Sequence, residues 1–151
     1  MKITSRGLLE VAEGGIGNSI QDLGRFGFRH MGITVSGYLD SLLARCANAL
    51  VGNPPESACI EIRAVAPRLR VRHGRIRFAL AGDTSATVKR FDGSTLHVPA
   101  WKSVTLDPQD LIEIATVAGG VAYLAITGGI NTPVQLGSRS TYQRAMIGGI
   151  D

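Results

Sequence analysis

The feature that most constrains this fold is a succession of short segments between residues 58 and 127 whose hydrophobic period is close to two. They occupy residues 58–63, 68–72, 75–82, 86–91, 95–99, 101–106, 111–116 and 121–127. A period of two places alternate side chains on opposite faces, so each segment is predicted to be a β-strand. Asp92-Gly93 and the Pro108 region predict tight turns between them. Short strands with tight turns predict a β-barrel or β-sandwich.

One segment departs from this period and predicts a helix over residues 40–51. Asp40 is suited to cap its N-terminus, while Gly52 and Pro54 are suited to end it. The predicted polar side carries Ser41, Arg45 and Asn48. The predicted core-facing stripe consists of Leu39, Leu42, Leu43, Cys46, Ala47 and Leu50. A further strand is expected at residues 8–12.

Composition narrows the possible partners and the compartment. The formal charge of +4 and the 5% aromatic content are too low to indicate nucleic-acid binding. The sequence shows no signal peptide and no apolar run long enough for a transmembrane helix, so we expect a cytoplasmic protein with no membrane partner. Cys46 and Cys59 are predicted to be reduced thiols. The three histidines lack ligand spacing, and no metal site is expected.

Two glycine-rich loops, at residues 13–40 and 128–151, carry the candidate binding residues. In the first loop, Gln21, Asp22 and Arg25 lie between glycines. The planar guanidinium of Arg25 suits a carboxylate or phosphate, although Asp22 and Arg25 could instead pair to hold the loop. In the second loop, the candidates are Ser138, Arg139, Ser140 and Thr141. Their hydroxyls, amides and positive charge suit an anion, and the alternative is a polar turn satisfied by its own side chains.

Two residues of the predicted helix are candidates for catalysis. Asp40 is a candidate catalytic carboxylate, and its alternative role is the helix cap. Asn48 is a candidate to present its amide to a ligand, and its alternative role is to bind neighbouring backbone. The arginines at positions 68, 70, 72, 75 and 77 alternate with apolar residues, which predicts a solvated outer face on two adjacent strands.

Five segments in order carry a resemblance to a known family: "SIQDLGRFGFRHMGITVSGYLD", "ANALVGNPPESACIEI", "FALAGD", "AYLAITGGI" and "LGSRSTYQRAMIGG". From about residue 5 to residue 151 the chain resembles the biotin-dependent carboxyltransferase family, also called the allophanate hydrolase subunit 2 family. The resemblance implies a mainly β fold, a cyclophilin-like β-barrel with one short α-helix. Family members are about twice this length, so residues 1–151 are expected to be the N-terminal part of a carboxyltransferase A/B-type domain.

The same resemblance implies a function. It suggests a subunit of an ATP-dependent 5-oxoprolinase-like hydrolase complex, which converts 5-oxoproline to glutamate with ATP bound by the complex. The expected partner is a B-type companion subunit, similar to allophanate hydrolase subunit 1, and an A subunit is a further candidate. One alternative is a carboxyltransferase that uses biotin and acts on urea or another small amide. Another is a non-catalytic regulatory module that binds the B-type protein.

Under this resemblance, Arg25, Ser138, Arg139 and Ser140 are expected to stabilise negative charge in a pocket for a small amide. Two departures from the family pattern affect this expectation. Tyr38-Leu39 makes the pocket edge before Asp40 bulkier. The acid of "AGDT" at residues 81–84 is shifted by one position, which leaves no clear role for Asp83 because a one-residue shift on a strand reverses the face.

Overall fold

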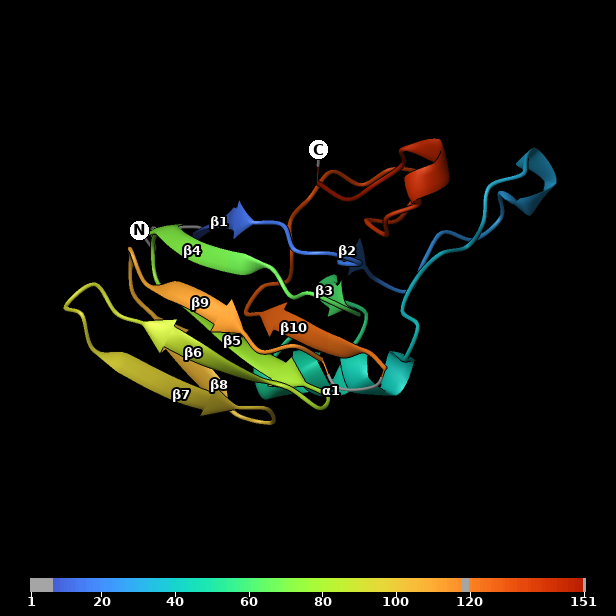
Figure 1. The fold of residues 1–151 in the computed structure, drawn as a ribbon. Helices are drawn as coiled ribbons and strands as arrows, with labels where there is room; N and C mark the ends of the chain where they lie inside the picture. Colours follow the sequence, from blue (N-terminus) through green and yellow to red (C-terminus); the bar gives the residue numbers. More distant parts are fainter. Residues whose placement is uncertain (1–6, 118–119, 151) are drawn as a thin grey trace.

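The computed structural model describes residues 7–117 and 120–150, which form two five-stranded antiparallel sheets, one α-helix and two 3-10 helices (Figure 1). The first sheet has the order β1 (Leu8–Glu13), β4 (Arg68–His73), β9 (Leu111–Ile114), β6 (Ser85–Lys89) and β7 (Thr95–Pro99). The second has the order β2 (Ser19–Gln21), β3 (Cys59–Ile62), β10 (Ala122–Ile126), β5 (Ile76–Ala81) and β8 (Ser103–Leu106). The predicted mainly β fold with one short α-helix is confirmed, and the barrel takes the form of two packed sheets.

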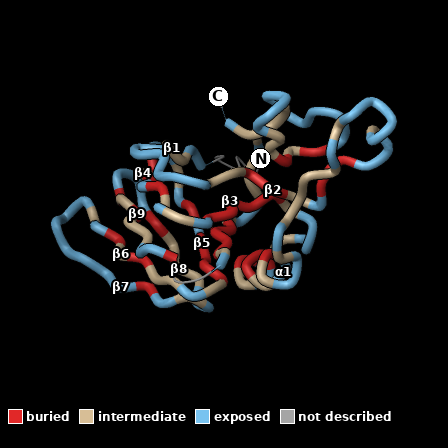
Figure 2. Tube along the Cα trace, turned by 45° about the vertical axis from the view of Figure 1, so that its right-hand side comes forward, coloured by how far each residue is buried: buried red, intermediate tan, exposed pale blue. Residues whose placement is uncertain are grey.

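The two sheets and the helix form three layers. The larger hydrophobic core fills the space between the sheets and includes Leu69, Phe78, Leu80 and Leu124, all fully buried. The helix α1 (Ser41–Leu50) covers the other face of the second sheet over β3, β10 and β5 (Figure 1). The central strands β3, β10 and β5 are therefore buried on both faces and are almost continuously red in Figure 2, whereas the edge strand β8 is mostly half-buried. Double burial explains why these three strands have nearly continuous apolar runs.

The eight strands expected between residues 58 and 127 and the one expected at 8–12 are all present, with ends that differ by at most two residues. Three elements were not predicted: β2 and the 3-10 helices η1 (Arg29–Met31) and η2 (Gln143–Ala145). Each is three residues long and lies in a glycine-rich loop, where no hydrophobic period can develop. The predicted domain covers residues 1–151, and its two ends lie outside the described residues.

The predicted orientation of the helix is partly wrong. Leu39 and Leu42, which were expected to face the core, are 64% and 69% exposed. The buried residues of α1 are Ala44, Ala47 and Asn48, and the last of these was expected on the polar side. The opposing face of the sheet is lined with Ala79, Ala81 and Ala125. These small side chains let the helix pack closely through its own alanines, so the bulkier leucines lie at the margins.

The alternation of the arginines is confirmed, but their placement on adjacent strands is wrong. Leu69 and Val71 of β4 point into the core, and Arg68 and Arg72 are exposed. Arg68 pairs with Glu13 at 2.8 Å, and Arg72 pairs with Glu10 at 2.7 Å. However, β4 and β5 belong to different sheets, because the chain crosses between the layers at residues 73–75. The basic side chains are therefore divided between two surfaces.

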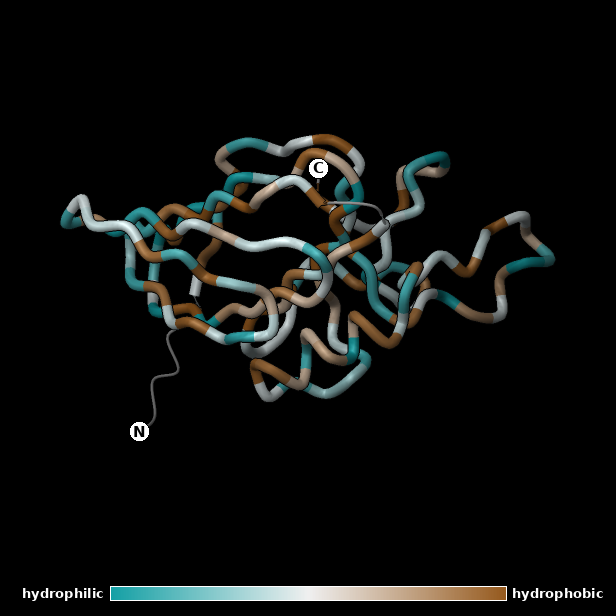
Figure 3. The backbone as a smooth tube through the Cα atoms, turned by 60° about the horizontal axis from the view of Figure 1, so that its bottom comes forward, coloured by the Kyte–Doolittle hydropathy of each residue, from teal (hydrophilic) through white to brown (hydrophobic). Residues whose placement is uncertain are grey.

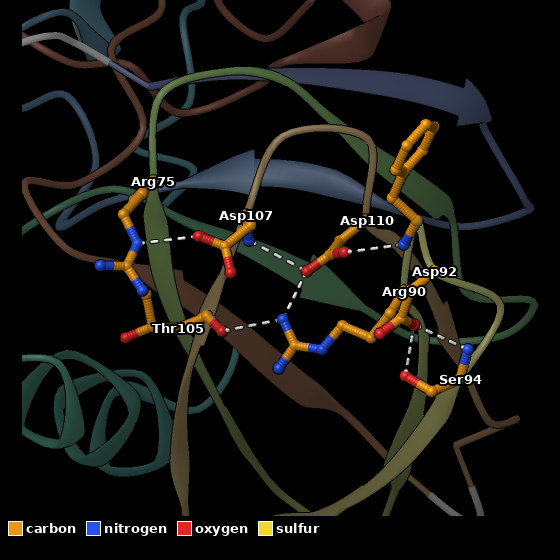
Figure 4. A network of polar contacts seen from close by, with 8 residues as sticks. Arg75, Arg90, Asp92, Ser94, Thr105, Asp107 and Asp110 are labelled. Carbon is orange, nitrogen blue, oxygen red and sulfur yellow. Dashed lines mark hydrogen bonds and ion pairs between the residues drawn. The ribbon is translucent and has the colours of Figure 1, made fainter.

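A polar network fixes the turns of the strands at one end of the molecule (Figure 4). Asp110 is 1% exposed, and its carboxylate pairs with Arg90 Nη1 at 2.5 Å and accepts from Asp107 N at 2.9 Å. Arg90 also donates to Thr105 O at 3.3 Å. These contacts hold the β6–β7 hairpin against the β8–β9 turn, and both predicted turns are confirmed. The buried carboxylate of Asp110 therefore has the partners that a buried charge requires, and these partners connect the two turns.

Candidate active site

The two candidate loops meet at the carboxylate of Asp22. Its Oδ1 accepts from the hydroxyls of Ser138 at 2.5 Å and Ser140 at 2.6 Å, and from Gly24 N at 2.8 Å. Its Oδ2 accepts from Arg139 N at 2.7 Å. We call the cluster of Asp22, Arg25, Ser138, Arg139 and Ser140 the Asp22 clasp. It joins segments that lie 118 residues apart in the sequence.

Arg25 is the most deeply buried charged group of the clasp, with 1% of its surface exposed. It donates to the carbonyl of Ser140 and, at 3.5 Å, to the hydroxyl of Ser36. Its Nε is buried and has no hydrogen-bond partner among the described residues. The described residues show no direct ion pair between Asp22 and Arg25. The two charges instead hold the same segment from two sides, Asp22 through Ser140 Oγ and Arg25 through Ser140 O.

The environment of the clasp shifts the pKa values of both charged groups. Burial raises the pKa of Asp22, but the hydrogen bonds from Ser138, Ser140, Arg139 and Gly24 outweigh it, so the pKa lies below its usual value. Burial lowers the pKa of Arg25, and the nearby charge of Asp22 counteracts part of this effect. Asp22 is therefore present as a carboxylate whose hydrogen-bonding capacity is largely used within the protein.

Gln21 and Thr141 extend this cluster along β2. The Gln21 amide donates to Ser19 Oγ at 3.0 Å and Thr141 O at 3.3 Å, and accepts from Gly37 N at 3.0 Å. Thr141 N donates to Ile20 O at 2.8 Å, and Ile20 N donates to the Thr141 hydroxyl at 3.2 Å. The segment around Thr141 therefore covers the edge of β2.

The structure brings all seven predicted anion-binding residues into one region, but most of their polar groups bind each other. Among the described residues, the Arg139 side chain makes no hydrogen bond or ion pair, and only its backbone takes part in the clasp. This geometry fits the alternative of loops satisfied by their own side chains, and the anion-binding role of these residues stays a prediction.

The segment between Asp22 and Tyr38 projects from the body of the molecule and carries η1 near its tip (Figures 1 and 3). Its base is closed by hydrogen bonds from Arg25 N to Val35 O at 2.8 Å and from Tyr38 N to Asp22 O at 3.0 Å. Gly24 has a φ of +95°, and a Cβ there would lie 2.6 Å from Val35 O. Glycine is therefore required at position 24, where the outgoing and returning segments of the loop approach each other.

Asp40 has two roles at the start of α1. Its Oδ1 accepts from Leu43 N at 3.0 Å, which confirms the predicted cap. Asp40 also lines a surface depression of about 530 Å³ together with Asp83, Trp101 and Val121. Asp83 follows β5 and is exposed, and it contributes a second carboxylate to this depression. A catalytic role for Asp40 therefore stays open alongside its role as a cap.

Asn48 is fully buried and bound to the loop that follows the helix. Its Nδ2 donates to Ser57 O at 2.8 Å, and its Oδ1 accepts from Asn53 Nδ2 at 3.0 Å. Asn53 in turn donates to Ile126 O at 2.7 Å. The amide of Asn48 therefore connects α1 to β10 through its neighbours. This is the backbone-binding alternative, and its predicted catalytic role is not supported by a free polar group.

A buried polar group that was not among the predicted site residues lies beneath the start of α1. The Glu61 carboxylate is 4% exposed and accepts from Tyr123 OH at 2.7 Å and from Leu39 N at 2.9 Å. The Tyr123 hydroxyl also accepts from Asp40 N at 2.9 Å. Burial raises the pKa of Tyr123 above its usual value. A single carboxylate inside the apolar strand β3 was the available signal, because a buried charge requires dedicated partners.

Two further properties concern the described residues as a whole. They contain no group of three or more side chains suited to hold a metal ion. Within the same part of the chain, no helix has both the length and the apolar character needed to cross a membrane.

Residues 31–151 match the family described as "Carboxyltransferase domain, subdomain A and B". The chain therefore belongs to this family, as its resemblance indicated.

Individual relatives give this family membership more detail. The chain is 33% identical to the C subunit of 5-oxoprolinase from Escherichia coli, with 95% of this chain and 45% of that protein covered. It is 34% identical to urea amidolyase of Saccharomyces cerevisiae, with 93% of this chain and 8% of that protein covered. The crystal structure of the K. lactis urea amidolyase superimposes with a TM-score of 0.83 at 34% identity, with 93% of this chain and 8% of that chain covered. The chain spans less than half the length of these relatives.

Proposed function

We propose that this chain is part of an ATP-dependent enzyme that hydrolyses a small cyclic amide, as the 5-oxoprolinase name describes. The observation that carries this proposal is the similarity, over almost the entire chain, to the C subunit of 5-oxoprolinase from Escherichia coli and Haemophilus influenzae, at 33% identity in both cases. The name of that subunit implies companion subunits. We propose a B-type companion as the direct partner and an A subunit as a further component.

The proposed chemistry assigns separate tasks to the complex and to this chain. ATP, bound by the complex, supplies the phosphoryl group that activates the lactam oxygen, since an unactivated amide is a poor electrophile. This chain supplies positive charge and hydrogen-bond donors. Arg139 is our candidate for contact with an anionic group of the nucleotide, because its guanidinium has no partner among the described residues. Asp40, beside Asp83 in the surface depression, is our candidate catalytic carboxylate.

The test is ADP release by the assembled complex. The chain is purified with its B-type and A-type companions, and ADP formation is measured with and without 5-oxoproline. We expect release that depends on 5-oxoproline and on the presence of this chain. A fully assembled complex that releases no ADP in response to 5-oxoproline would contradict the proposal.

The proposed catalytic role of Asp40 can be separated by mutation from its role as a helix cap. Asn and Asp cap helices about equally well, so Asp40→Asn retains the acceptor to Leu43 N and removes the charge. We expect Asp40→Asn to keep the unfolding free energy within about 0.5 kcal/mol and to reduce turnover. Asp40→Ala is the control for cap loss. Normal turnover in Asp40→Asn would exclude catalysis by this carboxylate.

The second candidate function is a carboxyltransferase that acts on urea or another small amide and uses biotin. The similarity to urea amidolyase supports it, at 34% identity and with a TM-score of 0.83 to the K. lactis structure. It differs from the first in its need for a biotin carrier. Urea-dependent turnover that avidin abolishes would support this second function, and 5-oxoproline-dependent turnover that persists with avidin would exclude it.

A further inference from the structure

A cavity of about 700 Å³ opens where the two sheets diverge, near their edge strands β1 and β2. Its wall includes Leu69 of β4, Ile60 of β3 and Ile20 of β2, all buried core residues. Thr141 and Gln143, from the segment beyond the Asp22 clasp, form another side. The volume lies within the usual range of small-molecule sites, and the lining combines apolar and polar side chains in similar measure.

Some polar groups of this cavity differ from those of the clasp because their donors are available, whereas the amide donors of Asn18 and Gln21 are bound within the protein. Among the described residues, the side chains of Arg63 and Gln143 make no hydrogen bond or ion pair. The Ser19 hydroxyl accepts from Gln21 Nε2, and the Thr141 hydroxyl accepts from Ile20 N. Each hydroxyl therefore retains its proton for donation. The cavity offers one cation and several neutral donors to a ligand.

The charge of the lining has a single sign. The described residues that line the cavity include the guanidinium of Arg63 and no aspartate or glutamate. In the clasp, by contrast, the carboxylate of Asp22 accepts hydrogen bonds from the hydroxyls of Ser138 and Ser140. An added anion would have to displace this carboxylate from its donors. Electrostatics therefore favours an anion in the cavity over one at the clasp.

We infer that this cavity, and not the clasp, binds a small organic carboxylate. Arg63 pairs with the carboxylate, the apolar wall packs against the carbon skeleton, and Gln143 with the Ser19 and Thr141 hydroxyls binds the remaining polar atoms. The inference rests on the proposed function in one respect, because 5-oxoproline is a carboxylate of this kind. The clasp then has a positioning role, since it fixes the segment that carries Thr141 and Gln143.

The experiment measures binding to the isolated chain without turnover, by titration calorimetry or by NMR shifts. Three probes separate the chemistry: 5-oxoproline, cyclopentanecarboxylate, which lacks the lactam, and 2-pyrrolidinone, which lacks the carboxylate. We expect both carboxylates to bind and 2-pyrrolidinone to bind about tenfold more weakly or not at all. The comparison tests whether the carboxylate is the recognised group.

Two charge-reversal variants test the position. Arg63→Glu should weaken carboxylate binding by more than about tenfold, because it replaces attraction with repulsion. The matched control is Arg77→Glu, an exposed position on β5 that does not line the cavity and changes the net charge equally. Circular dichroism checks that both variants are folded. Both substituted residues are exposed, so neither variant disturbs the core.

Three results would overturn the inference: no carboxylate binding at millimolar concentration, equal binding by Arg63→Glu and the unmodified chain, or equal weakening in Arg77→Glu. The proposed function fails separately. Arg63-dependent binding without ADP release by the complex would support the site and contradict the function. Normal 5-oxoproline turnover by a complex that contains Arg63→Glu would support the function and contradict the site.

Discussion

The replacement of Asp22 by alanine is the sharpest test of the clasp. The carboxylate accepts four hydrogen bonds of 2.5–2.8 Å from groups of two loops. A hydrogen bond to a charged group contributes about 1.5–3 kcal/mol when both partners are well shielded from water. Asp22 is only partly buried, and its hydroxyl donors can turn to water, so the sum must be reduced. The buried Arg25 also loses its nearby countercharge. We therefore expect a loss of about 3 kcal/mol.

The assay combines urea unfolding with limited trypsin digestion. Arg139 and Arg144 both lie in the segment that the clasp holds, so detachment of this segment should free the backbone at two cleavage sites for the protease. We expect faster cleavage there in Asp22→Ala than in the unmodified chain. Asp92→Ala is the matched control, because Asp92 accepts two hydrogen bonds from Ser94 in an exposed turn. It should cost clearly less stability than Asp22→Ala and should leave the cleavage rate unchanged.

The reasoning would be refuted if Asp22→Ala cost no more stability than Asp92→Ala and its cleavage pattern were unchanged. That result would mean that backbone pairing alone holds the segment, for example between Thr141 and Ile20. A large loss of stability with unchanged cleavage would also contradict the clasp, because the loss would then arise elsewhere.

Further predictions concern acid, one glycine and the buried amide. The pKa of Asp22 is lowered by folding, so its contribution to stability is present above about pH 4 and is lost as the pH falls through its folded value. Asp22→Asn should remove this part of the acid dependence in urea titrations between about pH 3 and pH 7, a range set by ordinary carboxyl pKa values of about 4. Gly148→Ala should cost about 3 kcal/mol, since the new Cβ would lie 2.3 Å from Ser140 O, whereas Gly93→Ala meets open space and should cost about 1 kcal/mol from its positive φ alone. Asn48→Ala should cost about 2 kcal/mol in urea unfolding, because it removes two buried hydrogen bonds, to Ser57 O and from Asn53 Nδ2, while Tyr38 OH still donates to Ser57 O and Asn53 Nδ2 still donates to Ile126 O; a loss below about 0.5 kcal/mol would contradict the structural role.

The strands were predictable because their signals are local. The Asp92-Gly93 turn and the alternation in β4 are visible within a few residues, and both are confirmed. The orientation of α1 was not predictable to the same degree. It depends on Ala79 and Ala125, which lie far along the chain and present a shallow surface to the helix. The leucine pattern in the sequence of the helix therefore does not show that Ala44 and Ala47 pack against the sheet.

In the candidate site, too, some features were predictable from local sequence and others depend on distant residues. Residue types identified both loops as polar and suited to charge, and the structure brings them together. What no local pattern could supply was the partner of each donor. The hydroxyls of Ser138 and Ser140 point to Asp22, so groups that seemed available to a ligand are bound within the protein. Arg63 carried no motif, since it follows an apolar strand, and only the three-dimensional arrangement places it beside a cavity.

The covering of β2 by Thr141 has a consequence for the order in which the molecule folds. β2 pairs with β3 through residues that lie about 40 positions apart in the sequence. The other edge of β2 pairs with Thr141, which follows β10 in the sequence. Loops of greater length close more slowly, so β2 exists first with an open edge. During synthesis this edge stays unpaired until the ribosome has released the segment beyond β10. A pause there would expose a strand edge that can pair with another chain.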